Sequence, residues 1–269
     1  MTTLQKVIKY LAIAFAIFLT VSIVSGILEA VGLISGLLDR DAVSEEVETY
    51  TVSGECTSLQ IEIGAADFVI RQGDALLVES NLKNITVKNE RGVLTIREKK
   101  GWNATYHDAV LTLYVPAGTV WKEAEITTGA GRLTVNELSA ERLELTLGAG
   151  ETNIDSLTAT VEADIQGGAG KITVAGGLLH NLDMEMGVGQ LDLTAALRGD
   201  CHFELGIGES KITLVGKRDD YTVHTDKGIS DLTVDGEAVS GRDRIGNGAN
   251  RIDISSGIGA IRLFFKTGF

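Results

Sequence analysis

The chain has 269 residues, among them 32 glycines and one proline, and carries a formal net charge of −13. This charge argues against a general nucleic-acid-binding protein, because contacts to phosphates require lysine and arginine. Hydrophobic residues make up 44% and charged residues 23%, which excludes a globally disordered chain. The two cysteines, Cys56 and Cys201, are too few for a disulfide framework or a zinc site.

The first predicted element is an apolar segment near the N-terminus. Residues 10–28 contain no charged side chain, and after Glu29 the apolar run continues to Leu38. A helix over residues 10–38 would be ~43 Å long, more than the ~30 Å hydrocarbon core of a bilayer. We therefore expect a transmembrane helix over residues 10–38 that anchors the chain in a membrane.

The charged residues around this segment predict its orientation. Lys6 and Lys9 precede it and Asp39 and Asp41 follow it, so the positive-inside rule places the N-terminus in the cytoplasm. The alternative is a cleaved signal peptide, but its apolar region is normally about 7–15 residues long and no Ala-x-Ala cleavage site follows this run. The predicted parts are a cytoplasmic N-terminus, a transmembrane anchor, a polar tether and an extracytoplasmic domain, over residues 1–9, 10–38, 39–49 and 50–269.

Short runs between residues 50 and 120 alternate between apolar and polar side chains, a pattern typical of strands. The expected strands are Leu59–Ile63, Phe68–Arg71, Leu76–Glu79, Ile85–Lys88, Val93–Arg97 and Val110–Val115. The stretch Ile63–Gly73 looks like a degenerate copy of a repeat that is clearer further along the chain. Because the end units of repeat proteins differ from the interior ones, we expect residues 50–80 and the C-terminal AIRLFFKTGF to cap the fold.

A Gly-x-Gly dyad recurs through the second half of the chain. GAG begins at Gly129, Gly148 and Gly168, GVG at Gly187 and GIG at Gly206, with spacings of 19, 20, 19 and 19 residues. A fixed period near 20 residues indicates stacked repeat units. The glycines expected at structural turns are Gly129, Gly131, Gly148, Gly150, Gly168, Gly170, Gly187, Gly189, Gly206 and Gly208.

The residues before and after each dyad alternate with a period of two, so a half-buried strand lies on either side of it. Two strands and two turns form one coil of ~19 residues, and successive coils stack ~4.8 Å apart around a shared core. We therefore predict an all-β fold, a single-chain β-solenoid preceded by one N-terminal transmembrane helix. The residue between the two glycines is apolar in every copy, as at Ala130 and Ile207, which predicts that it points inward.

The polar position four residues before each dyad holds a carboxylate in four successive coils. Stacking would place these side chains ~5 Å apart in a row, where like charges destabilise one another. Such a row of oxygens can bind calcium, and the alternative is a solvated ladder that salt screens. His202 and His224 continue the row and can bind a transition metal or respond to pH. The candidate cation column is Glu125, Glu144, Asp164 and Asp183.

The sequence contains no motif that points to an enzyme. The segment Gly167–Thr173 resembles a phosphate loop only superficially, because isoleucine stands at positions 165 and 172 where the loop needs glycine and serine or threonine. The dyads lack the third glycine and the following helix of a dinucleotide site. Basic residues do not cluster beside the acidic column, as they do in polysaccharide-cleaving β-helices. We therefore expect no catalytic residues and no cofactor.

The segment LTLYVPAG at Leu111–Gly118, followed by glycine-punctuated strands, resembles the bacterial putative-adhesin domain family. The resemblance covers roughly residues 50–265 and implies a membrane-tethered or secreted β-solenoid of largely unassigned function at the cell surface. That family often has Gly-Asp at the turn, where this chain has Gly-Ala-Gly, Gly-Val-Gly or Gly-Ile-Gly.

These observations predict a membrane-anchored module of the cell surface that interacts with a partner without catalysis. The expected partner is an unknown protein or a surface glycan, and not a nucleic acid. One alternative is an accessory subunit of an envelope sensing or signalling complex, which docks other membrane proteins through residues 10–38. Another is a surface filament, assembled end to end through exposed coil edges.

Overall fold

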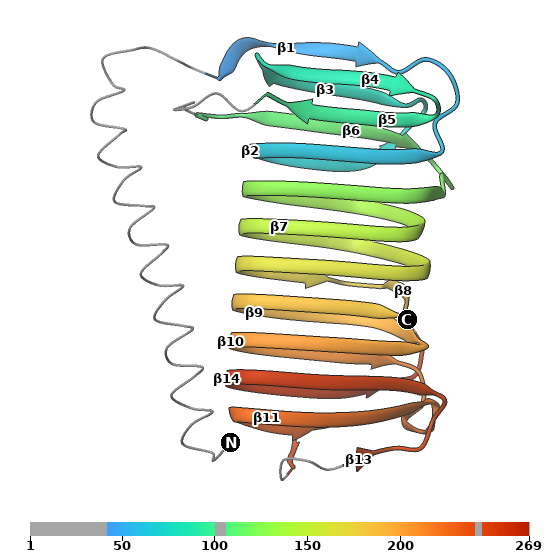
Figure 1. Cartoon of the computed structure of the whole chain (residues 1–269), viewed down its shortest axis with the longest axis vertical. Coiled ribbons are helices and arrows are strands. Elements are labelled where there is room, and N and C mark those ends of the chain that lie inside the picture. The colour runs from blue at the N-terminus through green and yellow to red at the C-terminus, as the bar shows by residue number, and fades with distance from the viewer. Residues whose placement is uncertain (1–41, 100–105, 240–243, 269) are drawn as a thin grey trace, which may run out of the picture.

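The structure is a computed structural model that describes residues 42–99, 106–239 and 244–268. These residues form a 14-stranded sheet in the order β1-β3-β6-β2-β7-β8-β9-β10-β14-β11-β12, with β4, β5 and β13 paired beside this path (Figure 1). The strands are β1 (Val43–Thr51), β2 (Ser58–Gly73), β3 (Leu77–Leu82), β4 (Ile85–Glu90), β5 (Val93–Glu98), β6 (Val110–Pro116), β7 (Trp121–Val174), β8 (Gly177–His180), β9 (Leu182–Arg198), β10 (Asp200–Val215), β11 (Tyr221–Val234), β12 (Glu237–Ala238), β13 (Arg244–Ile245) and β14 (Asn250–Lys266), and a 3-10 helix, η1 (Arg218–Asp220), precedes β11.

Most of the sheet is a stack of parallel strands that bend at a Gly-x-Gly corner. β7 is 54 residues long and winds back on itself, so that Gly148 lies against Gly129 and Gly168 against Gly148 (Figure 1). We term each bent segment a rung, with a first arm before the corner and a second arm after it. The register aligns the corners of neighbouring rungs, as where Val188 of β9 pairs with Ile207 of β10.

The hydrophobic core lies between the arms of the rungs. Leu143 and Leu145 before a corner and Ile154 after it are each at most 3% exposed, because every second side chain along an arm points inward. The buried side chains of all rungs form one continuous cluster, which includes the unpaired Cys201. Full burial of each such side chain contributes roughly 1.5–3 kcal/mol, so the rungs stabilise one another through this shared core.

Four of the six strands predicted between residues 50 and 120 are confirmed with small shifts of their ends, and the other two, Leu59–Ile63 and Phe68–Arg71, are parts of the single strand β2. β3, for example, covers Leu77–Leu82, where the sequence predicts Leu76–Glu79. The structure differs at the predicted tether, because Val43–Thr51 form β1 and pair antiparallel with β3. β1 thereby covers the edge of β3 that would otherwise be open to pairing with another chain.

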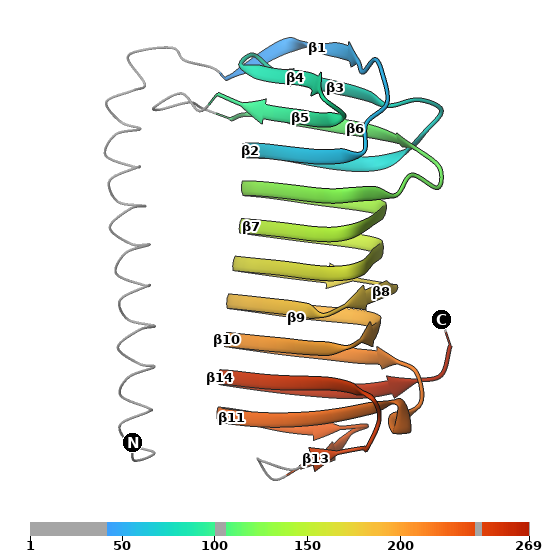
Figure 2. The same ribbon diagram turned by 45° about the vertical axis from the view of Figure 1, so that its right-hand side comes forward.

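The prediction of a solenoid built from successive coils is wrong in two places. Near the N-terminus, β3 pairs antiparallel with β6 and β4 pairs antiparallel with β5, so this part does not repeat the coil. Near the C-terminus, the sequence AIRLFFKTGF was expected to form a cap. Most of it belongs to β14, which instead lies inside the stack between β10 and β11 (Figure 2).

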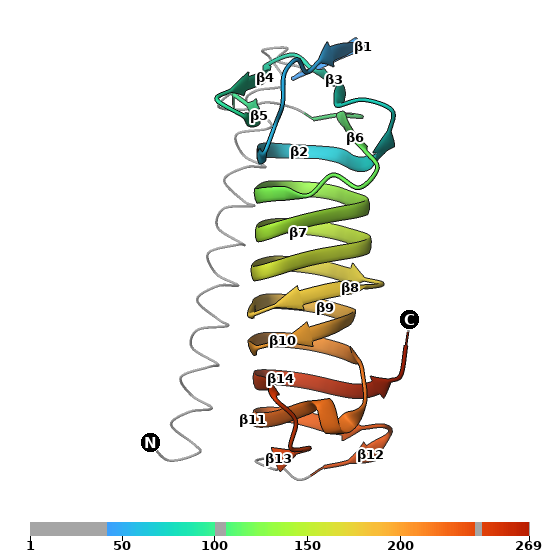
Figure 3. The same cartoon turned by 90° about the vertical axis from the view of Figure 1, so that its right-hand side faces the viewer.

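The dyad sequence explains why β14 and not β11 lies next to β10. β14 has both glycines, Gly257 and Gly259, whose Cα atoms lie against the backbone of the dyad of β10. β11 has Ser230 in place of the second glycine and pairs there with Gly259. A side chain at this position forces the corner into another shape, which a strand can adopt more easily where no further rung stacks on it. β11 accordingly lies at the end of the stack of rungs, beside β12 and β13 (Figure 3).

The predicted membrane-spanning helix also requires a correction. Residues 10–38 lie outside the described residues, and no helix within the described ranges is long and apolar enough to cross a membrane. This finding contradicts the predicted fold with an N-terminal transmembrane helix and the predicted single-pass location with a cytoplasmic N-terminus. Contact with a membrane through residues 10–38 stays a prediction.

The corner glycines allow the closest contacts between rungs. The second glycine of each predicted dyad has a φ between +114° and +148°, which residues with a side chain rarely adopt. A Cβ on Gly170 would overlap the carbonyl oxygen of Gly150, and a Cβ on Gly168 would overlap that of Gly148. Both glycines of a dyad are therefore required if their rung is to stack on the preceding one at the normal strand spacing.

We expect Gly170→Ala to lower the free energy of unfolding by about 3 kcal/mol or more. About 1–3 kcal/mol comes from the unfavourable φ, and the overlap with the Gly150 carbonyl adds to it. Gly118→Ala is the matched control, because Gly118 has a φ of +73° but no heavy atom within 4 Å of a Cβ, and about 1–2 kcal/mol is expected. Urea unfolding of the full chain followed by circular dichroism measures both, and equal losses would contradict the importance of the corner contact.

Candidate functional site

The apolar residue between the two dyad glycines points toward solvent, so the prediction that it points inward is wrong. Val188 is 40% exposed and Ile229 is 56% exposed. In the rung with the corner at 148–150, Leu147 is the last buried residue before the corner and Thr152 is the next one after it. The corner thus shifts the period-two alternation by one residue, because its second glycine has a positive φ. The residue between the glycines is thereby turned outward.

These outward side chains form a row that crosses the stack, which we term the corner ridge. Ladder pairing joins Ala65 to Ala130, Ala169 to Val188, and Ile207 to Val188. The side chains are small at the β2 end and larger at the β11 end. In the order of the stack, the corner ridge is Ala65, Ala130, Ala149, Ala169, Val188, Ile207, Ile258 and Ile229.

A groove runs beside the corner ridge on the side of the first arms. In the rungs with corners at 148–150, 187–189 and 206–208, two consecutive positions leave the floor free of outward side chains, because the residue before the dyad (Leu147, Met186 or Leu205) is buried and the first dyad residue is glycine. In the rung with the corner at 168–170, both positions are glycine. One wall is the corner ridge, and the other is the row of residues two positions before each dyad. The polar wall is Thr146, Gln166, Glu185, Glu204 and Ser255, and the apolar wall is Val188, Ile207 and Ile258.

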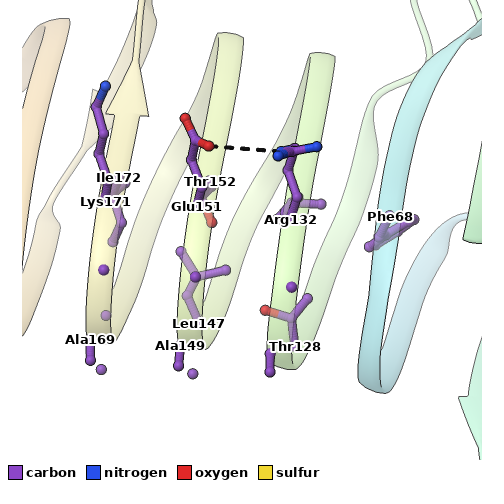
Figure 4. Close-up of a pocket in the computed structure, with 18 of the residues that line it drawn as sticks. Phe68, Thr128, Arg132, Leu147, Ala149, Glu151, Thr152, Ala169, Lys171 and Ile172 are labelled. Atoms are coloured by element: carbon purple, nitrogen blue, oxygen red, sulfur yellow. Dashed lines mark ion pairs between the residues drawn. The ribbon is translucent and has the colours of Figure 1, made fainter. Parts of the chain in front are cut away.

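The hollow on the opposite side of the corner ridge is too small for a ligand. Its volume of about 20 Å³ has room for about one water molecule. There the side chains form a ladder of alternating charge, in which Arg132 lies 3.8 Å from Asp67 and 3.7 Å from Glu151 and Lys171 follows on the next rung (Figure 4). Such exposed pairs contribute about 0–1 kcal/mol each, and we interpret them as support for the register.

The structure brings the predicted acidic column together on the outer face of the first arms. Asp164 pairs with Asp183, and Gln60 extends the row by donating a hydrogen bond of 3.0 Å to Glu125. Partial burial raises the pKa of Glu144, and the neighbouring carboxylates of Glu125 and Asp164 raise it further. In the described part of the chain, no three His, Cys, Asp or Glu side chains gather closely enough to hold a metal ion. Calcium binding by this row stays a prediction.

The two histidines expected to stack on each other are separated by Asp253. Because β14 lies between β10 and β11, the row runs from His202 through Asp253 to His224. The Nδ1 atom of His202 lies 3.5 Å from Oδ2 of Asp253, and Nε of Arg251 donates to the same oxygen at 2.9 Å. The expected pair of adjacent imidazoles is therefore replaced by a polar network in which the carboxylate of Asp253 contacts His202 and forms an ion pair with Arg251.

Sequence reasoning missed a buried carboxylate at the corner of β2. Glu98 is 4% exposed and accepts a hydrogen bond of 2.7 Å from the backbone N–H of Gly64. Burial raises the pKa of Tyr106, and the hydrogen bond of its hydroxyl to Glu98 raises it further. The available signal was a charged residue at an inward position, two residues after the buried Ile96. Glu98 satisfies the corner amide where the β-ladder of corners ends.

We expect Glu144→Gln to raise the melting temperature at pH 7 and low ionic strength. Because the pKa of Glu144 is raised in the folded state, its charged form is less stable there than in the unfolded chain. This penalty is present above the raised pKa and disappears below the ordinary value of 4.5, so the gain should vanish in acid and shrink with salt. Calorimetry across pH, with Glu137→Gln as an exposed control, measures the effect. A gain that does not depend on pH would rule out this explanation.

Comparison with known proteins places most of the chain in a described family. The family model named "Putative auto-transporter adhesin, head GIN domain" matches residues 51–224. No curated protein matches the chain.

Solved structures of low sequence identity cover most of the chain. A putative adhesin from Bacteroides fragilis NCTC 9343 is 13% identical, over 82% of this chain and 98% of that one, with a TM-score of 0.48. A putative adhesin from Parabacteroides distasonis ATCC 8503 is 14% identical, over 83% and 100%, with a TM-score of 0.45. A putative cell adhesion protein from Clostridium sporogenes ATCC 15579 is 15% identical, over 82% and 99%, with a TM-score of 0.33. We draw no functional argument from likenesses at this level.

Proposed function

Since the chain belongs to the family described as "Putative auto-transporter adhesin, head GIN domain", we propose that it is an adhesin-like surface module that binds its partner at the corner ridge, without catalysis. The membership confirms the resemblance to an adhesin family that the sequence indicates. The choice of the corner ridge as the binding surface is our own inference from the geometry.

The observation that carries the proposal is the exposure of apolar side chains in register along the stack. The core between the arms is already filled by inward side chains, so Val188 and Ile229 are not needed there. Contiguous apolar surface that polar residues border is typical of interaction sites. The rigid sheet also holds the corner ridge in one geometry, which lowers the entropic cost of binding.

The lining of the groove supports binding rather than catalysis. Its carboxylates, Glu185 and Glu204, are exposed on an open outer face. Water and salt screen such groups, whereas catalytic acids and bases are usually enclosed in a cleft. The lining includes the hydroxyls of Ser255 and Ser256, but no histidine or lysine that could activate them as nucleophiles stands in the lining beside them.

Capping of both ends of the sheet disfavours the filament alternative. At one end β1 pairs antiparallel with β3, and at the other β12 and β13 pair antiparallel with β11 (Figure 3). Short antiparallel strands at an edge reduce the opportunity for a second copy to add its own strand. A protein or a surface glycan that lies across the corner ridge fits the structure better.

We expect the triple variant Val188→Ser, Ile207→Ser, Ile258→Ser to lose at least tenfold in affinity for the partner, because it removes the apolar wall of the groove. Surface plasmon resonance of the full chain on a panel of immobilised cell-surface polysaccharides and proteins measures this. Val161→Ser is the matched control, because Val161 is also exposed, at 41%, but lies off the corner ridge.

Circular dichroism should show that all three proteins are folded alike. Equal binding by wild type, triple variant and control, or no binding to any member of the panel, would contradict the proposed surface. Conversion of a bound panel member into a product would contradict the absence of catalysis.

A further inference from the structure

We propose that the β11 end of the groove binds a basic amphipathic α-helix of a partner protein, three to four turns long. The inference rests on the proposed function and specifies its partner. We term the surface the helix site. It consists of residues that line the groove, the apolar Val188, Ile207 and Ile258 and the acidic Glu185 and Glu204, and of Ile229, the exposed neighbour of Ile258 on β11 that continues the corner ridge beyond the groove lining.

The spacing of the apolar side chains matches a helix over a limited length. Neighbouring rungs lie ~4.8 Å apart, and successive turns of an α-helix lie ~5.4 Å apart. The mismatch of ~0.6 Å per rung reaches only ~1.8 Å over four rungs, less than half a turn, so the side chains can insert between successive turns. The bulky residues of the corner ridge occupy four consecutive rungs, β9, β10, β14 and β11. This agreement sets the length of the helix at about 11–15 residues.

The width of the groove also suits a helix. The polar wall and the corner ridge are three residues apart along each strand, which corresponds to ~10 Å. An α-helix with its side chains is ~10–12 Å across. The glycine floor, at Gly187 and Gly206, lets the helix come close to the backbone of the sheet.

Charge decides which helix would bind. Glu185 and Glu204 are exposed along the polar wall, and neither forms an ion pair with a basic side chain among the residues that the structure describes. Asp183 stands on the same face, two residues before Glu185. Lysine or arginine on the flank of the helix would complement these charges. A second copy of this chain, with its net charge of −13, would be repelled.

The test uses the full chain and a synthetic 14-residue peptide with leucine on one helical face and lysine on the others. We expect saturable binding by fluorescence anisotropy and a rise in peptide helicity by circular dichroism. Ile207→Ser with Ile258→Ser, and separately Glu185→Gln with Glu204→Gln, should each weaken binding at least tenfold. Val161→Ser and the double variant Glu137→Gln, Glu141→Gln should bind as the wild type does, because they remove comparable groups away from the helix site.

Other peptides test the chemistry of the occupant. A peptide with glutamate in place of lysine should not bind, and a peptide with the same composition in scrambled order, which lacks an apolar face, should bind at least tenfold more weakly. Doubling the peptide to 28 residues should raise the affinity no more than twofold, because the longer peptide only offers two copies of the binding segment to one helix site. Equal effects of the helix-site and control variants, with matching thermal melts, would overturn the helix proposal.

The outcome separates this inference from the proposed function. If a member of the polysaccharide and protein panel binds at the corner ridge but the basic helix does not, the helix proposal is wrong and the proposed function stands. If the corner-ridge variants change neither kind of binding, both are wrong.

Discussion

The contact between glycine backbones at neighbouring corners is the constraint on which the rest of the structure depends. At the normal spacing of strands, a carbonyl oxygen of one corner occupies the space that a Cβ of the next would need, as Gly150 does for Gly170. The positive φ of the second glycine then turns the chain into its second arm. Repetition of this corner aligns the arms of successive rungs and lets them share one core.

The same corner creates the candidate site. The shift of alternation at the second glycine turns one apolar residue per rung outward, and the absence of a side chain on the first glycine leaves the groove beside it. The core does not use these side chains, so substitutions such as Ala149 to a larger apolar residue change the surface and leave the interior unaltered. The residues of the corner ridge change from alanine to valine and isoleucine along the stack. The largest apolar side chains therefore lie on the four rungs that end with β11.

At the ends of the stack, polar groups add to the contact of the one remaining corner glycine, Gly64 or Gly228. Glu98 accepts the hydrogen bond of the Gly64 amide at the corner of β2, where the ladder of corners ends. At the other end, Ser230 replaces the second glycine, and its hydroxyl receives a hydrogen bond of 3.0 Å from Ser256. Short antiparallel strands then cover the outer edges. Each end thus differs from the interior rungs because it has no further corner to contact.

The alternation of apolar and polar residues and the spacing of the Gly-x-Gly dyads determined which residues form strands, where the corners lie and which carboxylates share a row. Alternation gave the strands between Leu59 and Val115, and the period of the dyads aligned Asp164 with Asp183. Tertiary structure decided the direction of Val188, because a positive φ resets an alternation that the sequence alone extends through the corner. It also decided that β14 lies beside β10, since strand order depends on the fit between distant corners and not on distance along the chain.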